Sequence, residues 1–298
     1  MKEKFVDHKF NRSSLELITT ANGILNEYAG QGYRLSLRQL YYQLVARDFI
    51  ENTVKSYKRI GNLVSDARLA GLLDWGMIED CGRDANIPTA WTSPAEIVRA
   101  AAQQFRVDRW QGQPCHVEVM VEKDALSGIL GPVCRELHVR FTANKGYSSS
   151  SAMYDAGKRM ANARKYGKQI HVFYFGDHDP SGIDMTRDID ERLAQFARTG
   201  KIEVHRLALN MNQVEEWNPP ENPAKETDSR FEAYQEQFGD SSWELDAVEP
   251  RTLANLVREN VGELIDHDQW QEVMEGEERM REELQSFADE YENREEGE

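Results

Sequence analysis

Between Cys115 and Leu209 the sequence alternates short apolar runs with amphipathic stretches, and no other feature restricts the fold as strongly. Apolar runs of this length predict buried strands, and the stretches between them have the spacing of helices that cover a sheet. We expect strands over 116–121, 139–143, 170–175 and 204–209, with helices over 124–137, 149–164 and 183–198. Because strands alternate with helices, the predicted fold class is α/β, with a parallel sheet flanked by helices.

Three helical stretches come before this region. Apolar residues at helical spacing predict helices over 13–28, from residue 36 onward and over 55–73, and Ser13 with Glu16 has the spacing of a capping box. Basic side chains are expected on or near the outer side of the third helix: Lys55, Lys58, Arg59 and Arg68. Three short helices of which the last is basic are typical of a winged-helix or helix-turn-helix module that binds DNA.

Composition shifts suggest three parts. Pro88 and Pro94 mark a linker over 86–94, so we predict a winged-helix DNA-binding domain over 1–94. A metal-binding α/β domain with an extension follows over 95–265; within it, residues 210–250 are expected to be irregular and the chain to be helical again from Thr252. Residues 266–298 are predicted to form an acidic tail, helical or disordered.

The formal net charge of −16 is unfavourable for a nucleic-acid partner at first sight. Residues 271–298 hold twelve acidic and three basic residues, whereas residues 1–110 hold fifteen basic and thirteen acidic ones. The excess of negative charge therefore lies mainly in the tail, which we expect to be solvated, and the first part of the chain is free to meet double-stranded DNA.

The sequence has no apolar stretch long enough to cross a bilayer and no apolar signal segment after Met1, so we predict no membrane partner and a cytoplasmic, nucleoid-associated protein. Cys81, Cys115 and Cys134 lack paired spacing, which indicates reduced thiols rather than disulfides or a structural zinc site.

Carboxylates follow two of the predicted strands. Glu122 comes after the first strand, and Asp177 and Asp179 come after the third. Ligands of parallel sheets bind beyond the carboxyl ends of the strands, and three carboxylates there suit Mg²⁺. Aspartates at such turns also serve as helix caps, which is the alternative interpretation. His178, between the two aspartates, receives no role.

The turn after the second strand holds Lys145 and Gly146, followed by serines over 148–151. These residues could approach a phosphate at the start of the next helix, although serine-rich turns are also ordinary caps.

Several segments resemble one known family. The segments 121–124, 144–146 and 177–182 (VEKD, NKG and DHDPSG) resemble the Toprim domain of the topoisomerase VI A subunit and its meiotic double-strand-break relatives. Ser36 to Tyr42 resembles the S-x-R-x-x-Y-Y element of that family's winged helix, and the segments 213–218 and 243–247 resemble its Toprim extension. The chain is most similar to compact, free-standing A-subunit relatives of phages and mobile elements.

Two departures from the family pattern stand out. Tyr147, Ser148 and Ser149 replace the usual Pro-Asp after the Lys-Gly pair, so one acidic contributor is missing. The amino-terminal part is also short where the family docks its ATPase, which leaves an ATPase partner of B-subunit type an open question.

Helical spacing distinguishes the two tyrosines of the family element. Tyr41 shares the apolar stripe of Leu37, Leu40 and Leu44, which indicates a core position. Tyr42 lies off this stripe and four residues after Arg38, whose guanidinium would favour phenolate and hold a phosphate. Tyr42 is therefore the predicted nucleophile, and the resemblance implies the same position. An aromatic side chain that packs on a neighbouring element is the alternative.

Together these features predict Mg²⁺-dependent DNA cleavage by tyrosine transesterification, with a 5′-phosphotyrosyl link and Glu122, Asp177 and Asp179 at the metal. Glu122 could instead act as a general acid or base. The resemblance implies a homodimer in which the tyrosine of one subunit works with the metal of the other. Two alternatives remain open: a Toprim nuclease that activates water, and a DNA-binding regulator without catalysis.

Overall fold

The computed structural model describes residues 2–79, 90–144, 146–198 and 202–295. Four parallel strands form the central sheet in the order β2-β1-β3-β4: Arg140–Ala143, Cys115–Val121, Gln169–Phe175 and Glu203–Ala208. The predicted α/β class and the parallel sheet are confirmed, with strand bounds within one residue of the expected ones at most ends.

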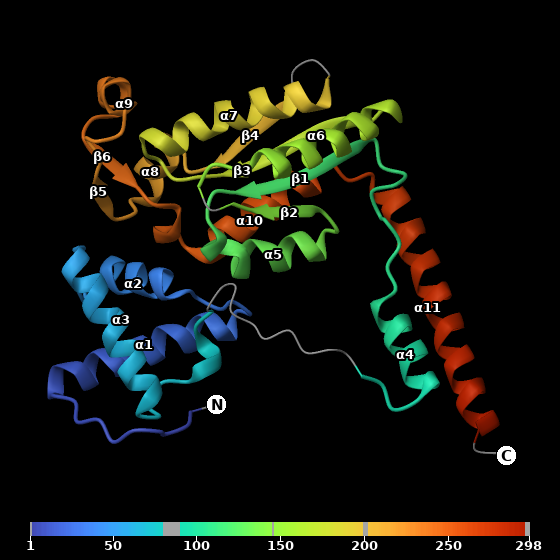
Figure 1. Cartoon of the computed structure of the whole chain (residues 1–298), viewed down its shortest axis with the longest axis horizontal. Helices are drawn as coiled ribbons and strands as arrows, with labels where there is room; N and C mark the ends of the chain where they lie inside the picture. The colour runs from blue at the N-terminus through green and yellow to red at the C-terminus, as the bar shows by residue number, and fades with distance from the viewer. Residues whose placement is uncertain (1, 80–89, 145, 199–201, 296–298) are drawn as a thin grey trace.

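Helices cover both faces of this sheet (Figure 1). The first face carries α6 (Ser150–Lys165) and α7 (Pro180–Ala197), whose methionines and leucines pack on Met120 and Val172. The second face carries α5 (Ser127–Glu136) and α10 (Pro250–Gly262), which pack on Val119 and Val121. Because both faces are covered, the strands can be apolar throughout, as their continuous runs predict.

The amino-terminal module consists of α1 (Arg12–Gly30), α2 (Leu37–Ala46) and α3 (Val54–Leu69), followed by the 3-10 turn η1 (Trp75–Met77). Asn11, rather than Ser13, caps α1, because its side chain accepts a bond from the Ser14 amide. The described residues of this module form only two single bridges, Lys4 to Ala70 and Leu35 to Ile78, so the structure supports a helical module and leaves the wing a prediction. Residues 86–89 of the predicted linker over 86–94 lie outside the described residues, as does Cys81, and Pro94 already begins α4 (Pro94–Gln104).

Residues 210–250 are ordered, so the expectation of an irregular segment was wrong. They form α8 (Met211–Trp217), the hairpin strands β5 (Glu221–Pro223) and β6 (Ser241–Trp243), α9 (Phe231–Phe238) between them, and the turn η3 (Leu245–Ala247). The elements are short, and their order comes from packing, since Trp243 and Leu245 are buried in the same core as the sheet. This extension lies beside the carboxyl ends of the strands and above α2 and α3 in the view of Figure 1.

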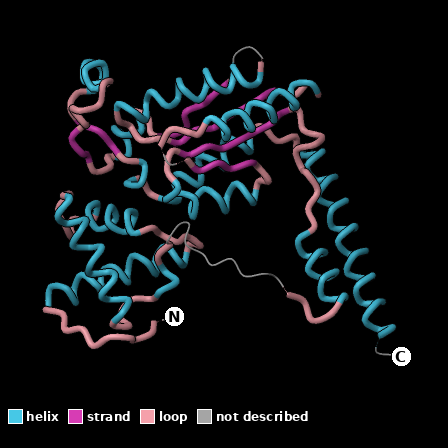
Figure 2. The backbone as a smooth tube through the Cα atoms, in the orientation of Figure 1, coloured by secondary structure: helices cyan, strands magenta, loops and turns pink. Residues whose placement is uncertain are grey.

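The last helix, α11 (His267–Glu295), packs along α4 (Pro94–Gln104), and the pair projects away from the sheet (Figure 2). Ala288 is fully buried, and the buried carboxylate of Glu277 pairs with Arg109 at 3.1 Å and Arg281 at 2.7 Å. The expected solvated tail is therefore a helix with one packed face. No helix among the described residues is long and apolar enough to span a bilayer.

Candidate functional site

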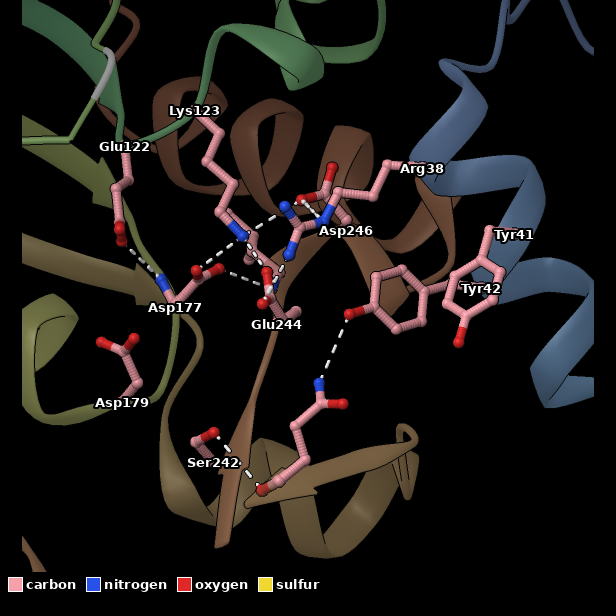
Figure 3. A network of polar contacts seen from close by, with 12 residues as sticks. Arg38, Tyr41, Tyr42, Glu122, Lys123, Asp177, Asp179, Ser242, Glu244 and Asp246 are labelled. Atoms are coloured by element: carbon pink, nitrogen blue, oxygen red, sulfur yellow. Dashed lines mark hydrogen bonds and ion pairs between the residues drawn. The ribbon is translucent and has the colours of Figure 1, made fainter. Parts of the chain in front are cut away.

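The predicted acids meet where the strands of the sheet end. Glu122 follows β1 and is 6% exposed, and Asp177 follows β3 and is 4% exposed. The Asp177 amide donates to Oε2 of Glu122 at 2.9 Å, so the two strand ends are bonded directly to each other. Figure 3 shows the carboxylate of Asp179 on the same side of this loop as that of Glu122.

Asp179 also caps α7, as the alternative interpretation of these aspartates as helix caps predicts. Its Oδ1 accepts from the Gly182 amide at 2.6 Å and from the Ser181 hydroxyl at 3.0 Å. This cap starts α7 at Pro180, three residues earlier than predicted, because proline suits the first position of a helix. Position 182 requires glycine because the backbone of Asp177 lies close to it: a Cβ at this position would lie 2.2 Å from the Asp177 carbonyl oxygen. The cap engages one carboxylate oxygen and leaves the other for a ligand.

Lys123 is the residue at this edge whose role the sequence did not indicate. Its ammonium lies 2.6 Å from Oδ2 of Asp177 and 3.1 Å from Oδ2 of Asp246, and it also pairs with Glu244. Oδ1 of Asp177 accepts from the Leu245 amide at 2.8 Å, so both oxygens of this carboxylate are engaged. Glu244 and Asp246 belong to a segment that resembled the family's extension, and that resemblance was the only signal for them.

Arg38 extends the same network into the amino-terminal module (Figure 3). Its guanidinium lies 2.6 Å from Glu244 and 3.6 Å from Asp246. One continuous set of ion pairs therefore joins α2, the turn η3 and the end of β1. We call this set, made of Arg38, Lys123, Asp177, Glu244 and Asp246, the bridging network.

Tyr42 lies beside the bridging network but is only 4% exposed. Its hydroxyl accepts a bond from Nδ2 of Asn222 at 3.3 Å, across the interface to the hairpin β5–β6. Burial and the Glu244 carboxylate raise the pKa of Tyr42 more than Asn222 and Arg38 lower it. Arg38 thus favours the phenolate, as expected, but the burial of Tyr42 and the Glu244 carboxylate outweigh its effect.

Tyr41 has the structural role that its spacing predicts. Its hydroxyl donates to Oδ1 of Asn52 at 2.9 Å, and its ring packs edge-on against Tyr57. Asn52 in turn donates to Oδ1 of Asn222 at 2.9 Å. Tyr41 thus supports the loop that holds the hairpin against the module.

The acids lack a full set of counter-charges. Burial raises the pKa of Glu122, and Asp179 raises it further, although the Asp177 amide and Lys123 oppose the shift. Burial likewise raises the pKa of Asp177 against the effect of Lys123. Buried carboxylates with raised pKa values favour a bound cation, and oxygen ligands suit magnesium. The donor chemistry of Glu122 and Asp179 therefore fits that ion.

The three carboxylates do not converge on a ready-made site. In the described part of the chain, the set that brings three ligand atoms within 4.8 Å of one another is His171, Glu203 and His205. Asp177 could join a cation at Glu122 and Asp179 only if Lys123 withdrew from it.

His178 points away from the acids. It is 1% exposed, and its Nδ1 lies 2.7 Å from the Tyr234 hydroxyl, while its backbone pairs with Trp243. Burial and Arg206 lower its pKa to about 4, so the ring is neutral at pH 7. His178 anchors the extension to the loop. Arg206 braces the same loop by donating to the carbonyl oxygens of Gly176, Asp177 and Gly182.

The predicted DNA-binding residues divide into two groups. Lys55, Lys58 and Arg59 are exposed on α3. Arg68 is buried, donates to the carbonyl oxygens of Trp75 and Ile78, and stacks on the Trp75 ring at 5.5 Å. The expectation that Arg68 lies on or near the outer side of α3 was wrong, because the end of this helix packs against η1.

Lys145 lies outside the described residues. Ser149 caps α6 by accepting from the Ala152 amide, in agreement with the ordinary interpretation of the serine turn. Tyr147 donates to Asp184 at 2.8 Å. Cys115 and Cys134 are free thiols.

No family model, no curated protein and no solved structure matches this chain.

Proposed function

We propose that this protein cleaves double-stranded DNA at a magnesium site, by attack of Tyr42 on a backbone phosphate. The observation that carries the proposal is the bridging network. It places Arg38 and Tyr42 of α2 next to the strand-end acids of a separate α/β unit. The resemblance to the topoisomerase VI A subunit and its relatives links the same residues, which makes the chain a candidate member of that family.

The proposed reaction is a transesterification. The Tyr42 oxygen forms a bond to phosphorus as the bond from phosphorus to the 3′ oxygen breaks, and the strand keeps a 5′-phosphotyrosyl end. The phenol loses its proton and the departing 3′ oxygen gains one. Glu122, whose pKa is raised, would hold that proton only in place of binding the metal, as the alternative to its role as a ligand. When bound at Glu122 and Asp179, with Asp177 as a third ligand, magnesium would supply charge stabilisation for the phosphate.

DNA must first change the pairing of Arg38. A phosphate is a strong acceptor for a guanidinium and would compete with Glu244 and Asp246 for it. Arg38 would then hold the phosphate next to Tyr42. Because it would no longer be paired with Glu244 and Asp246, it would lower the pKa of the phenol further. Lys55, Lys58 and Arg59 of α3 supply positive charge for the neighbouring backbone.

Plasmid cleavage tests the proposal. Supercoiled DNA incubated with protein and Mg²⁺ should yield linear product that enters the gel only after protease treatment. Y42F should form no adduct, whereas the matched variant Y41F should keep adduct formation because Tyr41 only supports the loop. Adducts that persist in Y42F would contradict Tyr42 as the nucleophile.

The arrangement of subunits has its own test. We propose a homodimer that cuts both strands, and mixing Y42F with D179N chains distinguishes two arrangements. If the tyrosine of one subunit works with the metal of its partner, mixed dimers contain one intact site and nick the plasmid. If both groups act within one chain, every site in the mixture is defective and no nick forms.

Hydrolysis at the same metal site is the second candidate. The burial of Tyr42 and its raised pKa favour this alternative, since both oppose attack by the phenol. A hydrolytic enzyme would cut in Y42F as in the natural chain, leave ends free of protein, and lose cleavage in D179N.

A further inference from the structure

A second group of metal-ligating side chains lies near the amino ends of β3 and β4, whereas the acids follow the carboxyl ends of their strands. His171 pairs with Glu203 in the register of the two strands, and His205 follows two residues after Glu203. Alternate residues of a strand share a face, and paired residues of neighbouring strands do too. His171, Glu203 and His205 therefore project from the same face of the sheet.

The distances among these side chains are close to those of a coordination shell. Oε2 of Glu203 lies 3.9 Å from Nδ1 of His171 and 3.5 Å from Nε2 of His205. A tetrahedral ion with bonds of about 2.0–2.1 Å holds its ligand atoms about 3.3 Å apart. The two imidazole rings are nearly parallel, with centroids 5.7 Å apart. Small rotations of the side chains would close the remaining gap.

The chemistry of the three groups selects the kind of ion. Two imidazoles and one carboxylate suit zinc and related transition metals, whereas magnesium prefers oxygen ligands alone. Burial and the neighbouring His205 lower the pKa of His171, so its ring is neutral and able to coordinate. The side chains of Glu203 and His205 are 63% and 42% exposed, so an ion can enter from solvent and keep a water ligand.

We propose that His171, Glu203 and His205 bind one zinc-class divalent ion, at a site separate from the carboxylates that serve magnesium. The ion would clamp the edge strand β4 to β3. Arg206 follows His205 directly and donates to the loop that carries Asp177. Zinc bound to His205 would thus stabilise β4, and through Arg206 of the same strand it would stabilise the loop of the candidate active site.

Zinc titration of the metal-free full chain by calorimetry tests this assignment. One equivalent should bind, and H205A should weaken binding by more than about 10-fold, since removing a ligand costs at least as much as removing an outer partner. H8A is the matched control, because His8 is 41% exposed, nearly as much as His205, and lies 3.9 Å from a single carboxylate, that of Asp66. H8A should bind zinc as the natural chain does.

Two further measurements locate the ion. Cobalt bound in place of zinc should give the visible absorption of a four-coordinate site in the natural chain and lose it in H205A. Zinc should raise the melting temperature of the natural chain and of E122Q/D179N, but not that of H205A. Zinc affinity that is unchanged in H205A, or lost in E122Q/D179N, would overturn the proposal.

Discussion

Two buried glutamates, Glu118 within β1 and Glu122 directly after it, behave in opposite ways. Glu118 is fully buried and receives two bonds from the guanidinium of Arg159, at 2.8 and 2.7 Å, with His116 at 3.0 Å. Arg159 and His116 lower the pKa of Glu118 against the effect of burial. Glu122, four residues on, accepts the Asp177 amide and lies near Asp179, and its pKa is raised.

The difference lies in the counter-charge rather than in burial. Arg159 is dedicated to Glu118, whereas the ammonium nearest to Glu122 belongs to Lys123, which pairs with Asp177, Glu244 and Asp246. A fully paired buried acid holds a fold together, and an incompletely paired one is ready for a ligand or a proton. β1 thus ends in a reactive position four residues after a structural one.

Removal of Arg159 should have the largest effect. R159A leaves the Glu118 carboxylate buried without its main partner, which should lower the free energy of unfolding by about 3–5 kcal/mol. Urea denaturation measures this value. R12A is the control, because the pair of Arg12 with Glu16 is exposed and should contribute less than about 1 kcal/mol. Equal losses in the two variants would refute the structural role of Glu118.

Magnesium should stabilise the Glu122 end of the strand. At a concentration 100 times the dissociation constant, a bound ion adds about 2.7 kcal/mol to the free energy of unfolding. The gain should disappear in E122Q/D179N, as measured by denaturation with and without Mg²⁺. The same gain should persist in H205A, whose lesion lies at the other end of the sheet. Full stabilisation of E122Q/D179N would mean that magnesium binds elsewhere.

Loss of Lys123 should destabilise the fold and at the same time strengthen the binding of Mg²⁺. K123M leaves Asp177, Glu244 and Asp246 with Arg38 as the remaining cation of the network, so we expect a loss of about 2 kcal/mol, smaller than for a buried ion left with no partner. Because Oδ2 of Asp177 is then available, Mg²⁺ should bind K123M more tightly than the natural chain. Calorimetry checks the affinity, and weaker binding in K123M would show that Lys123 supports the site instead of competing for it.

The smallest effect is a difference in pH dependence. The raised pKa of Glu122 means that its ionisation destabilises the folded state above its ordinary pKa of 4.5. E122Q should therefore be more stable than the natural chain at pH 7 without metal, and the difference should vanish as the pH falls below 4.5. E118Q should show the opposite sign, because the lowered pKa of Glu118 contributes stability above 4.5 that is lost in acid. Parallel curves for the two variants would contradict the comparison.

Local patterns accounted for most of the sheet and for some of the site. Continuous apolar runs predicted all four strands. The spacing of Leu37, Leu40 and Leu44 predicted that Tyr41 is buried, but it did not reveal that Tyr42 is buried to the same extent, each being 4% exposed. Expectations failed where short elements depend on packing, as in residues 210–250. They also failed for Arg68, whose place on a helix does not reveal that the turn at Trp75 folds back over it.

What the sequence determined by itself is the alternation of strands and helices, and with it the edge where Glu122, Asp177 and Asp179 gather, because carboxyl ends of parallel strands meet at one side of a sheet. Only the tertiary structure decided which charged and metal-ligating side chains lie next to one another. Lys123 pairs with Glu244, 121 positions away, and His171 meets His205 across two strands. Coulomb energies depend on distance in space and on burial, and neither quantity is a property of sequence separation.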